Sequence, residues 1–202
     1  PPADIYAFST YTNNFNMCCN IAKQLKGKYP NATTVAGGYH VSAIPSDGFR
    51  NFDITVVGEG EKAMRSIAED THHYKNFDRE IYGDGVCELD DLPSPNYDKI
   101  NIDDYTREVD GNKVLSIVCS RGCYAKCAFC NSIISKMYPV RSRTNDNILM
   151  EVDSMVSKYN IKYIKFNDDN FLDCVDDPVG LANEMCARGI KYRCMVRADS
   201  LT

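Results

Sequence analysis

The chain has 202 residues and a formal net charge of −5, with 44% hydrophobic and 25% charged residues. These values are ordinary for a globular protein of one or two domains. No apolar run approaches the length of a membrane span, no secretory signal is present and no basic stretch is long. The sequence therefore indicates no membrane and no evident nucleic acid as a partner.

The first 70 or so residues alternate between strands and helices. Strands are predicted over Asp4 to Ser9, Thr33 to Ala36 and Asp53 to Val57, and helices over Asn14 to Lys28 and Glu61 to about Glu69. Such alternation predicts a parallel sheet with helices on its faces. Ligands of such sheets bind at the carboxyl ends of the strands, where Ser9, Gly37-Gly38 and Gly58-Glu59-Gly60 are expected.

The segment from Leu89 to Tyr97 is acidic and interrupted by prolines, which is typical of an extended linker. We therefore predict one domain over residues 1–75, a linker over 76–112 and a second domain over 113–202. In this second half, strands are predicted over Lys113 to Cys119, Lys162 to Phe166 and Lys191 to Val196. Helices are predicted from Thr144 or Asn145 to about Tyr159, and from Pro178 to Arg188 with Gly189 as the stop.

Three cysteines, Cys123, Cys127 and Cys130, lie within eight residues after the first strand of the second half. This spacing suits one loop around a soft metal centre, and thiolates are the preferred ligands of iron–sulfur clusters. Three thiols leave one iron of a four-iron cluster open, and an open metal position is typical of chemistry rather than structure. The other seven cysteines are scattered, which fits a reducing cytosol better than a disulfide scaffold. The predicted location is cytoplasmic.

With Arg121-Gly122 before the first cysteine and Phe129 before the last, the motif resembles that of the radical S-adenosylmethionine (SAM) enzymes. The resemblance implies that Cys123, Cys127 and Cys130 bind three irons of a [4Fe-4S] cluster and that the fourth iron chelates SAM. One-electron reduction by a flavodoxin or ferredoxin type of reductant would then cleave SAM to a 5'-deoxyadenosyl radical. The same resemblance makes residues 113–202 the first half of a TIM-like radical SAM barrel.

Active sites of such barrels lie at the carboxyl ends of the strands, where this sequence has Asp168, Asp169 and Arg197. The resemblance implies that the SAM adenine lies near the backbone of Phe129, its amino or ribose groups near Asp168 or Asp169, and its carboxylate near Arg197. Helix capping or loop solvation is the structural alternative for the two aspartates.

The first half resembles the cobalamin-binding domain that precedes many radical SAM enzymes. The likeness lies in Pro2-x-Asp4, Ser9-x-Tyr11, Gly37-Gly38-x-His40 and Gly58-Glu-Gly-Glu61. It implies a partial Rossmann-like domain without its first strand, and cobalamin contacts from Ser9, Tyr11, Gly37, Gly38, Gly58 and Glu59. Paired glycines would let the backbone approach the nucleotide tail of the cofactor. Tyr39 stands where the family usually has proline.

Three polar residues are expected to have no cofactor role. His40 is expected to be a polar loop residue rather than a cobalt ligand, and the motif that supplies a lower histidine in cobalamin mutases is absent. Arg141 and Arg143 are expected at the surface.

The resemblances together imply an α/β enzyme that uses a [4Fe-4S] cluster, SAM and cobalamin for methyl transfer to an unactivated carbon of a small-molecule or peptide substrate. Methylthiotransferase-like chemistry, ring rearrangement and cyclisation are alternatives within the same architecture. A non-catalytic zinc or iron–sulfur module is the alternative from another class, with Cys119 as fourth ligand. Cys119 also ends a predicted buried strand, which would give it a packing role instead.

The chain opens with Pro1 rather than Met and holds only about three of the six β/α units of the barrel, so we expect a fragment of a longer enzyme. A half barrel leaves a strand edge unpaired. We therefore predict poor solubility and poor SAM retention for the chain alone.

Overall fold

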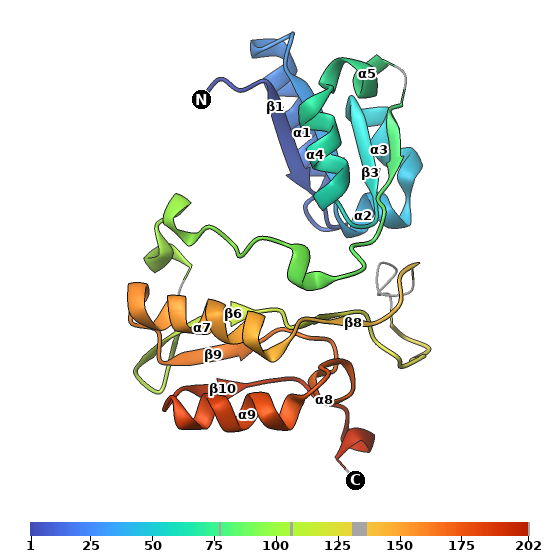
Figure 1. Cartoon of the computed structure of the whole chain (residues 1–202). Coiled ribbons are helices and arrows are strands. Elements are labelled where there is room, and N and C mark those ends of the chain that lie inside the picture. The colour runs from blue at the N-terminus through green and yellow to red at the C-terminus, as the bar shows by residue number, and fades with distance from the viewer. Residues whose placement is uncertain (77, 106, 131–136, 202) are drawn as a thin grey trace. The chain divides into compact units, whose positions relative to one another are not determined.

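The computed structural model describes residues 1–76, 78–105, 107–130 and 137–201 (Figure 1). It divides into two compact units, one of Pro1–Val86 with Asn131–Tyr138 and one of Cys87–Cys130 with Pro139–Thr202. Each unit contains its own four-stranded sheet. No helix in the described ranges is long and apolar enough to cross a membrane.

The sheet of the first unit is entirely parallel. Its strands β1 (Ile5–Ser9), β2 (Thr33–Gly37), β3 (Ile54–Val57) and β4 (Glu80–Tyr82) pair in that order. The helices of this unit are α1 (Phe15–Lys28), α2 (Tyr39–Ala43), α3 (Pro45–Asn51), α4 (Glu61–Glu69) and α5 (Thr71–Asn76). The predicted strands and the two predicted helices are confirmed to within a residue. The sequence missed β4, α2, α3 and α5 because segments of three to seven residues are too short to show a period.

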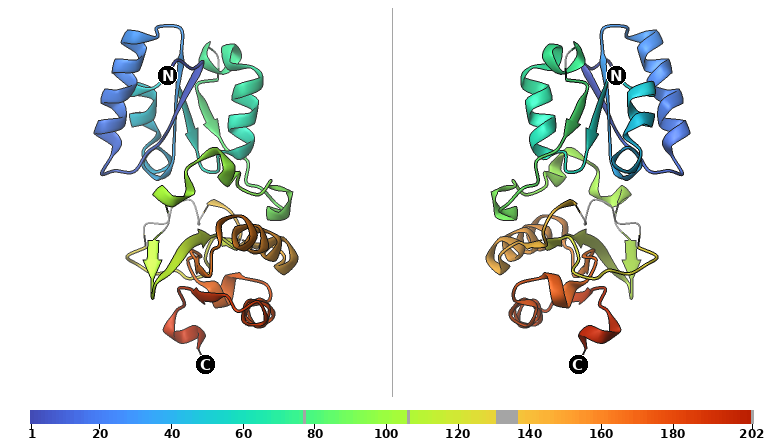
Figure 2. Two further views of the ribbon diagram at one scale, coloured as in Figure 1. Left: turned by 90° about the vertical axis from the view of Figure 1, so that its left-hand side faces the viewer. Right: turned by 90° about the vertical axis from the view of Figure 1, so that its right-hand side faces the viewer.

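Helices cover both faces of this sheet, as Figure 2 shows for the blue and teal helices. On one face Ala36 packs with Phe15 and Ala22 of α1 and with Phe52 after α3. Its strand neighbour Val35 points the other way and packs with β3 and α4 residues such as Ile67. Strands β2 and β3 are buried along almost their whole length, as expected for parallel strands that are covered on both faces. The arrangement is consistent with a Rossmann-like domain.

The sheet of the second unit is mixed. Its order is β10 (Lys191–Arg193), β9 (Tyr163–Phe166), β6 (Asn112–Ile117) and β5 (Arg107–Val109), and only β5 runs antiparallel to its neighbour. A two-stranded ribbon joins β7 (Ser120–Arg121) to β8 (Arg141–Ser142). The helices are α7 (Asn145–Tyr159), α8 (Phe171–Cys174) and α9 (Pro178–Ala187), and short 3-10 turns lie at Leu89–Asp91, Tyr97–Lys99, Ile102–Asp104 and Ala198–Ser200.

The core of the second unit lies on one face of its sheet. Leu115 and Ile117 of β6 and Ile164 and Phe166 of β9 face the same side, because paired residues of neighbouring strands share a face. The apolar face of α7 and residues of α9 pack onto them. The α/β class is confirmed, whereas the described residues form an open mixed sheet and show no barrel.

The ends of the long helices follow the predicted capping signals. Thr144 accepts a hydrogen bond from the Asn147 N–H at 3.3 Å, so Thr144 rather than Asn145 is the N-cap of α7. Gly189 follows α9 with φ of 66°, the left-handed conformation that favours glycine after a helix.

The prediction that Arg143 lies at the surface was wrong. Its side chain is only 13% exposed and forms a 2.6 Å ion pair with Glu151, which is 3% exposed. The Tyr97 hydroxyl donates to the same carboxylate at 2.7 Å, and burial followed by this bond raises the pKa of Tyr97. The sequence does not reveal the pair because Glu151 lies among the apolar residues of α7 that face the core.

The predicted linker over residues 76–112 contains regular structure in its described parts. Strand β4 pairs within the first unit, and β5 pairs within the second. The 3-10 turn Leu89–Asp91 is held to the start of α7, because the Asp90 carboxylate accepts the Thr144 hydroxyl at 2.6 Å. The domain limits given above remain a prediction.

Candidate functional site

A cavity of about 300 Å³ lies in the first unit and includes residues at the carboxyl ends of β1, β2 and β3. Its lining is mostly apolar or glycine: Ala7, Phe8, Ser9, Val35, Gly37, Gly38, Val56, Gly58, Gly60 and Met64. Four glycines among ten lining residues leave backbone atoms accessible to a ligand. The sequence predicted Ser9 and the glycines at this edge, and the structure brings them together.

Gly38 is required by the backbone itself. Its φ is +96°, and a Cβ at this position would lie 2.8 Å from both the N and the O of Thr10. Thr10 is fully buried there and donates its hydroxyl to the Gly37 carbonyl at 2.8 Å. Both glycines therefore line the cavity, and Gly38 in addition allows the close crossing with Thr10.

The turn after β3 also needs glycine. Gly58 has φ of +88°, and its N–H donates to the Ser42 hydroxyl at 2.9 Å. An added Cβ would collide with the hydroxyl of Tyr138, which belongs to the first unit. That hydroxyl accepts the Glu59 N–H at 3.2 Å and donates to the Gly83 carbonyl. By contrast, a Cβ on Gly60 would meet nothing within 4 Å, so this glycine faces open space.

Glu59 and Tyr11, two predicted cobalamin residues, differ in exposure. Glu59 is buried, and its carboxylate accepts the Val86 N–H at 2.9 Å. Tyr11 is 49% exposed and stacks on Tyr39 with ring centroids 5.6 Å apart. Tyr39 is 43% exposed, so the two rings form an aromatic pair that is open to solvent beside Gly38.

His40 is engaged on both ring nitrogens. The ring is 7% exposed, its Nε2 lies 3.2 Å from the Asp47 carboxylate and its Nδ1 lies 3.2 Å from the Thr12 hydroxyl. It also packs on Phe15 with centroids 4.0 Å apart. The prediction of a loop residue was wrong, because His40 lies in α2, and both ring nitrogens already have hydrogen-bond partners.

Asp168 lies just after β9, at the carboxyl edge of the second sheet. Its Oδ1 accepts three hydrogen bonds, from the N–H groups of Cys119 and Ser120 and from the Ser120 hydroxyl at 2.6 Å. Its Oδ2 is buried without a hydrogen-bond partner among the described residues. Burial raises the pKa of Asp168, and the Ser120 and Cys119 hydrogen bonds reduce that rise. Asp168 therefore fixes the strand end that leads into the cysteine loop.

The cysteine loop of Cys123, Cys127 and Cys130 follows directly. All three side chains are partly exposed, and none of the three forms a disulfide. A turn closed by the Cys130 N–H and the Cys127 carbonyl, 3.1 Å apart, reverses the chain between these two cysteines. No three metal-binding side chains converge on one point within the described residues. The donor set nevertheless fits an iron–sulfur cluster, because three thiols lie within eight residues of one irregular loop.

Cys119 differs from these three cysteines. It is fully buried in the core of the second unit, and burial followed by the Asp168 charge raises its pKa far above the usual range. The thiolate is the metal-binding form, so this environment opposes ligation by Cys119. Its predicted packing role is confirmed.

The predicted SAM residues occupy different environments. Phe129 is 91% exposed, and Asp169 is exposed after β9. Arg197 donates from Nη1 to the Cys127 sulfur at 3.0 Å and is held by Asp199 through two further bonds. The structure thus brings Arg197 to the cysteine loop, and Asp168 to the strand that precedes the loop.

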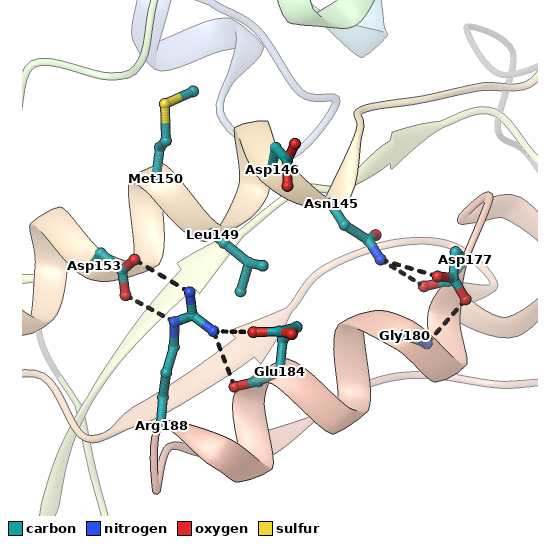
Figure 3. A pocket seen from close by; sticks show the side chains of 9 residues that line it. All are labelled: Asn145, Asp146, Leu149, Met150, Asp153, Asp177, Gly180, Glu184 and Arg188. Carbon is teal, nitrogen blue, oxygen red and sulfur yellow. Dashed lines mark hydrogen bonds and ion pairs between the residues drawn. The ribbon is translucent and has the colours of Figure 1, made fainter.

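A larger groove of about 540 Å³ between α7 and α9 is occupied by polar contacts between the two helices (Figure 3). Arg188 bonds to the carboxylates of Asp153 and Glu184, and Asn145 donates to the Asp177 carbonyl at 3.1 Å. The groove holds the helices together, and its polar groups satisfy one another, so we assign it no ligand.

This chain is similar to known proteins in sequence and in fold. Residues 2–68 match the B12 binding domain family. An uncharacterized methyltransferase of Pyrococcus horikoshii, PH0819, is 27% identical over 186 residues, covering 83% of this chain and 40% of that protein. The cobalamin-dependent radical SAM methyltransferase TokK of Streptomyces tokunonensis is 40% identical over 67 residues, covering 32% of this chain and 10% of TokK.

A solved structure extends the likeness in fold. The radical SAM methyltransferase TsrM from Kitasatospora setae, solved with cobalamin and a [4Fe-4S] cluster bound, has a TM-score of 0.69 at 15% identity. The match covers 93% of this chain and 41% of TsrM. At this identity the likeness concerns the fold alone.

Residues 2–68 therefore match a B12 binding domain, as the sequence motifs predicted, and the chain is similar to cobalamin-dependent radical SAM methyltransferases over 67 residues. It spans about two fifths of the length of PH0819 and of TsrM. Sequence reasoning missed Tyr138 and Thr10 as residues that shape the cavity edge. Only their tertiary contacts, and no spacing in the sequence, could have shown this.

Proposed function

We propose that this chain provides the cobalamin and cluster sites of a cobalamin-dependent radical SAM methyltransferase acting on an unactivated carbon. One observation supports this most directly: a B12-binding domain and a Cys-x3-Cys-x2-Cys loop lie in one chain, each at the carboxyl edge of parallel strands. Neither feature alone distinguishes this function from simple cofactor or metal binding.

In this proposal the cavity of the first unit takes the nucleotide tail of cobalamin. Contacts would come from the predicted set of Ser9, Tyr11, Gly37, Gly38, Gly58 and Glu59. The apolar lining and the open space over Gly60 suit a bulky, largely uncharged group. The exposed pair of Tyr11 and Tyr39 offers an apolar ring face to the cofactor.

The cysteine loop would hold the cluster through Cys123, Cys127 and Cys130, with one iron left for SAM. When bound, the cluster supplies the electron that cleaves SAM to a 5'-deoxyadenosyl radical, and cobalamin carries the methyl group. The residues of this chain bind and orient these groups. Asp168 anchors the start of the loop through the Cys119 and Ser120 N–H groups.

The polar groups around the loop are proposed to contact SAM. The exposed carboxylate of Asp169 can accept bonds from the amino or ribose groups, and the exposed Phe129 backbone can approach the adenine. The two unused N–H groups of Arg197 can donate to the SAM carboxylate, because a guanidinium has five and three are used here. A flavodoxin or ferredoxin type of reductant, a small-molecule or peptide substrate and a cytosolic setting complete the proposal. The ten cysteines, none of which forms a disulfide, support the last point.

Two cofactor titrations test the proposal. We expect the longest obtainable form of the protein, reconstituted anaerobically with iron and sulfide, to give a [4Fe-4S]+ EPR signal that shifts when SAM is added. We also expect it to bind hydroxocobalamin with a change in visible absorbance. As a matched control, Cys119→Ser should keep its iron, because this cysteine is in the core.

Each adverse outcome has a distinct meaning. A cluster whose signal ignores SAM would contradict the open iron position, and loss of metal in Cys119→Ser would support a closed four-cysteine site. One bound zinc and no iron would support the structural module. If the cluster responds to SAM but cobalamin does not bind, radical SAM chemistry still stands and methyl transfer through cobalamin is refuted.

A further inference from the structure

One cysteine of the loop has a charged hydrogen-bond donor. The guanidinium Nη1 of Arg197 lies 3.0 Å from the sulfur of Cys127, although the two residues are 70 positions apart in the sequence. Arg197 follows β10 and begins the 3-10 turn Ala198–Ser200 as its N-cap. The fold of the second unit therefore brings the end of β10 to the cysteine loop.

The guanidinium is held in place by a second residue. Asp199 accepts the Nε–H of Arg197 at 2.9 Å on one carboxylate oxygen and an Nη2–H at 2.6 Å on the other. This two-point contact fixes the plane of the guanidinium, since both groups are planar and match each other in geometry. The remaining nitrogen, Nη1, is the one that meets Cys127. The orientation is thus set by Asp199 and does not depend on the thiol.

We infer that Arg197 is a positioning residue that raises the reduction potential of the [4Fe-4S] cluster by donating an N–H···S hydrogen bond to its ligand Cys127. The inference rests on the proposed function, because it requires a cluster on this loop. Hydrogen bonds to ligand sulfurs withdraw electron density and favour the reduced, more negative cluster. A higher potential makes the cluster easier to reduce by a given electron donor.

The test is a potentiometric EPR titration of the reconstituted chain, which measures the midpoint potential and needs no turnover. Arg197→Gln should shift the midpoint to a more negative value, because a neutral amide is a weaker donor than a guanidinium. Arg197→Lys keeps the charge but loses the planar fork, so its midpoint should fall between those of Arg197→Gln and the unchanged chain. Arg193→Gln is the matched control. It removes an exposed arginine four residues upstream, which forms no bond to a cysteine among the described residues, and should leave the midpoint unchanged.

Equal midpoints for Arg197→Gln, Arg193→Gln and the unchanged chain would overturn the inference while the proposed function stands. If Arg197→Gln holds no cluster, the midpoint potential of Arg197→Lys tests the inference instead. A more negative midpoint supports tuning, and an unchanged midpoint shows that Arg197 only stabilises the loop. If the unchanged chain itself forms no cluster, the proposed function fails and the inference fails with it.

Discussion

The two carboxyl edges of this chain prepare for their ligands in different ways. In the first unit, glycines and apolar side chains enclose a cavity of about 300 Å³ that exists without a ligand. In the second unit, charged side chains order the start of the cysteine loop, but no three metal-binding side chains converge within the described residues. The first edge is therefore shaped mainly by glycines and apolar packing, whereas the second is shaped by charged groups that bond to the loop and to the strand before it.

The two units also treat buried charge differently. In the first unit, Asp53 is compensated by Lys26 at 2.9 Å and by the N–H and hydroxyl of Thr34. In the second, Asp168 accepts three neutral hydrogen bonds on one oxygen and has no cation beside it among its recorded partners. The pKa of Asp53 is consequently lowered, because its bonds outweigh burial, whereas the pKa of Asp168 is raised by burial.

The largest expected effect is the loss of iron binding at the second edge while cobalamin binding at the first edge is kept. Replacing Cys123, Cys127 and Cys130 together by serine should abolish iron binding, because neutral hydroxyls do not replace thiolates as cluster ligands. Cobalamin binding by the first unit should persist. Iron analysis and cobalamin absorbance on the same sample measure both. Cys186→Ser, at an exposed cysteine of α9, is the control, and retained iron in the triple variant would contradict the cluster assignment.

The next effect concerns the stability of the second unit. Glu151→Gln should lower its free energy of unfolding by about 3 kcal/mol, because Arg143 would keep a buried charge without its counter-ion. Glu69→Gln, in the exposed i,i+4 pair with Arg65 of α4, should have no measurable effect. Urea denaturation followed by circular dichroism measures both variants. Equal transitions for the two variants would show that the Arg143–Glu151 pair is solvated.

A smaller effect is expected at the cavity of the first unit. Gly38→Ala should cost about 1–3 kcal/mol, because φ of +96° and the approach to Thr10 both oppose a Cβ. It should also weaken cobalamin binding by displacing the Gly37–Gly38 turn. Gly27→Ala in α1 is the matched control, since nothing lies within 4 Å of its added Cβ and alanine should stabilise the helix by about 0.5–1 kcal/mol. Thermal unfolding that ranks the two variants in the opposite order would refute this account.

The smallest effect is a pH dependence of opposite sign in the two units. A carboxyl group whose pKa is raised on folding, such as that of Asp168, makes the folded protein less stable as the pH rises above the ordinary pKa of 3.8. Asp53, whose pKa is lowered, contributes stability above 3.8 that is lost as the pH falls. Asp168→Asn should therefore flatten the decline of the melting temperature between pH 4 and pH 7, and Asp53→Asn should lower the melting temperature most at neutral pH. If the melting temperatures of the unchanged chain and of Asp168→Asn change with pH in parallel, the charge of Asp168 does not destabilise the fold.

The sequence predicted the long elements because their periods are clear. Strand β3 is a short run of β-branched residues, and α7 carries apolar residues at helical spacing between Thr144 and Tyr159. The same reasoning failed for Arg143, since a sequence shows that an arginine is charged but not that Glu151 faces it in the core. It also missed Tyr138, whose role depends on contacts with Glu59 and Gly83 made over more than 50 positions.

By itself the sequence determined the α/β class and the residues that lie at the two carboxyl edges, and it predicted an iron–sulfur cluster on the cysteine loop. These follow from local patterns: periodicity, glycines after strands and the spacing of thiols along a few residues. Tertiary structure decided which partners each polar group has. It placed Arg197 on Cys127 and left one oxygen of Asp168 without a hydrogen-bond partner among the described residues. Such pairings join residues that are tens of positions apart, and the packing of whole sheets, rather than any local propensity, brings them within bonding distance.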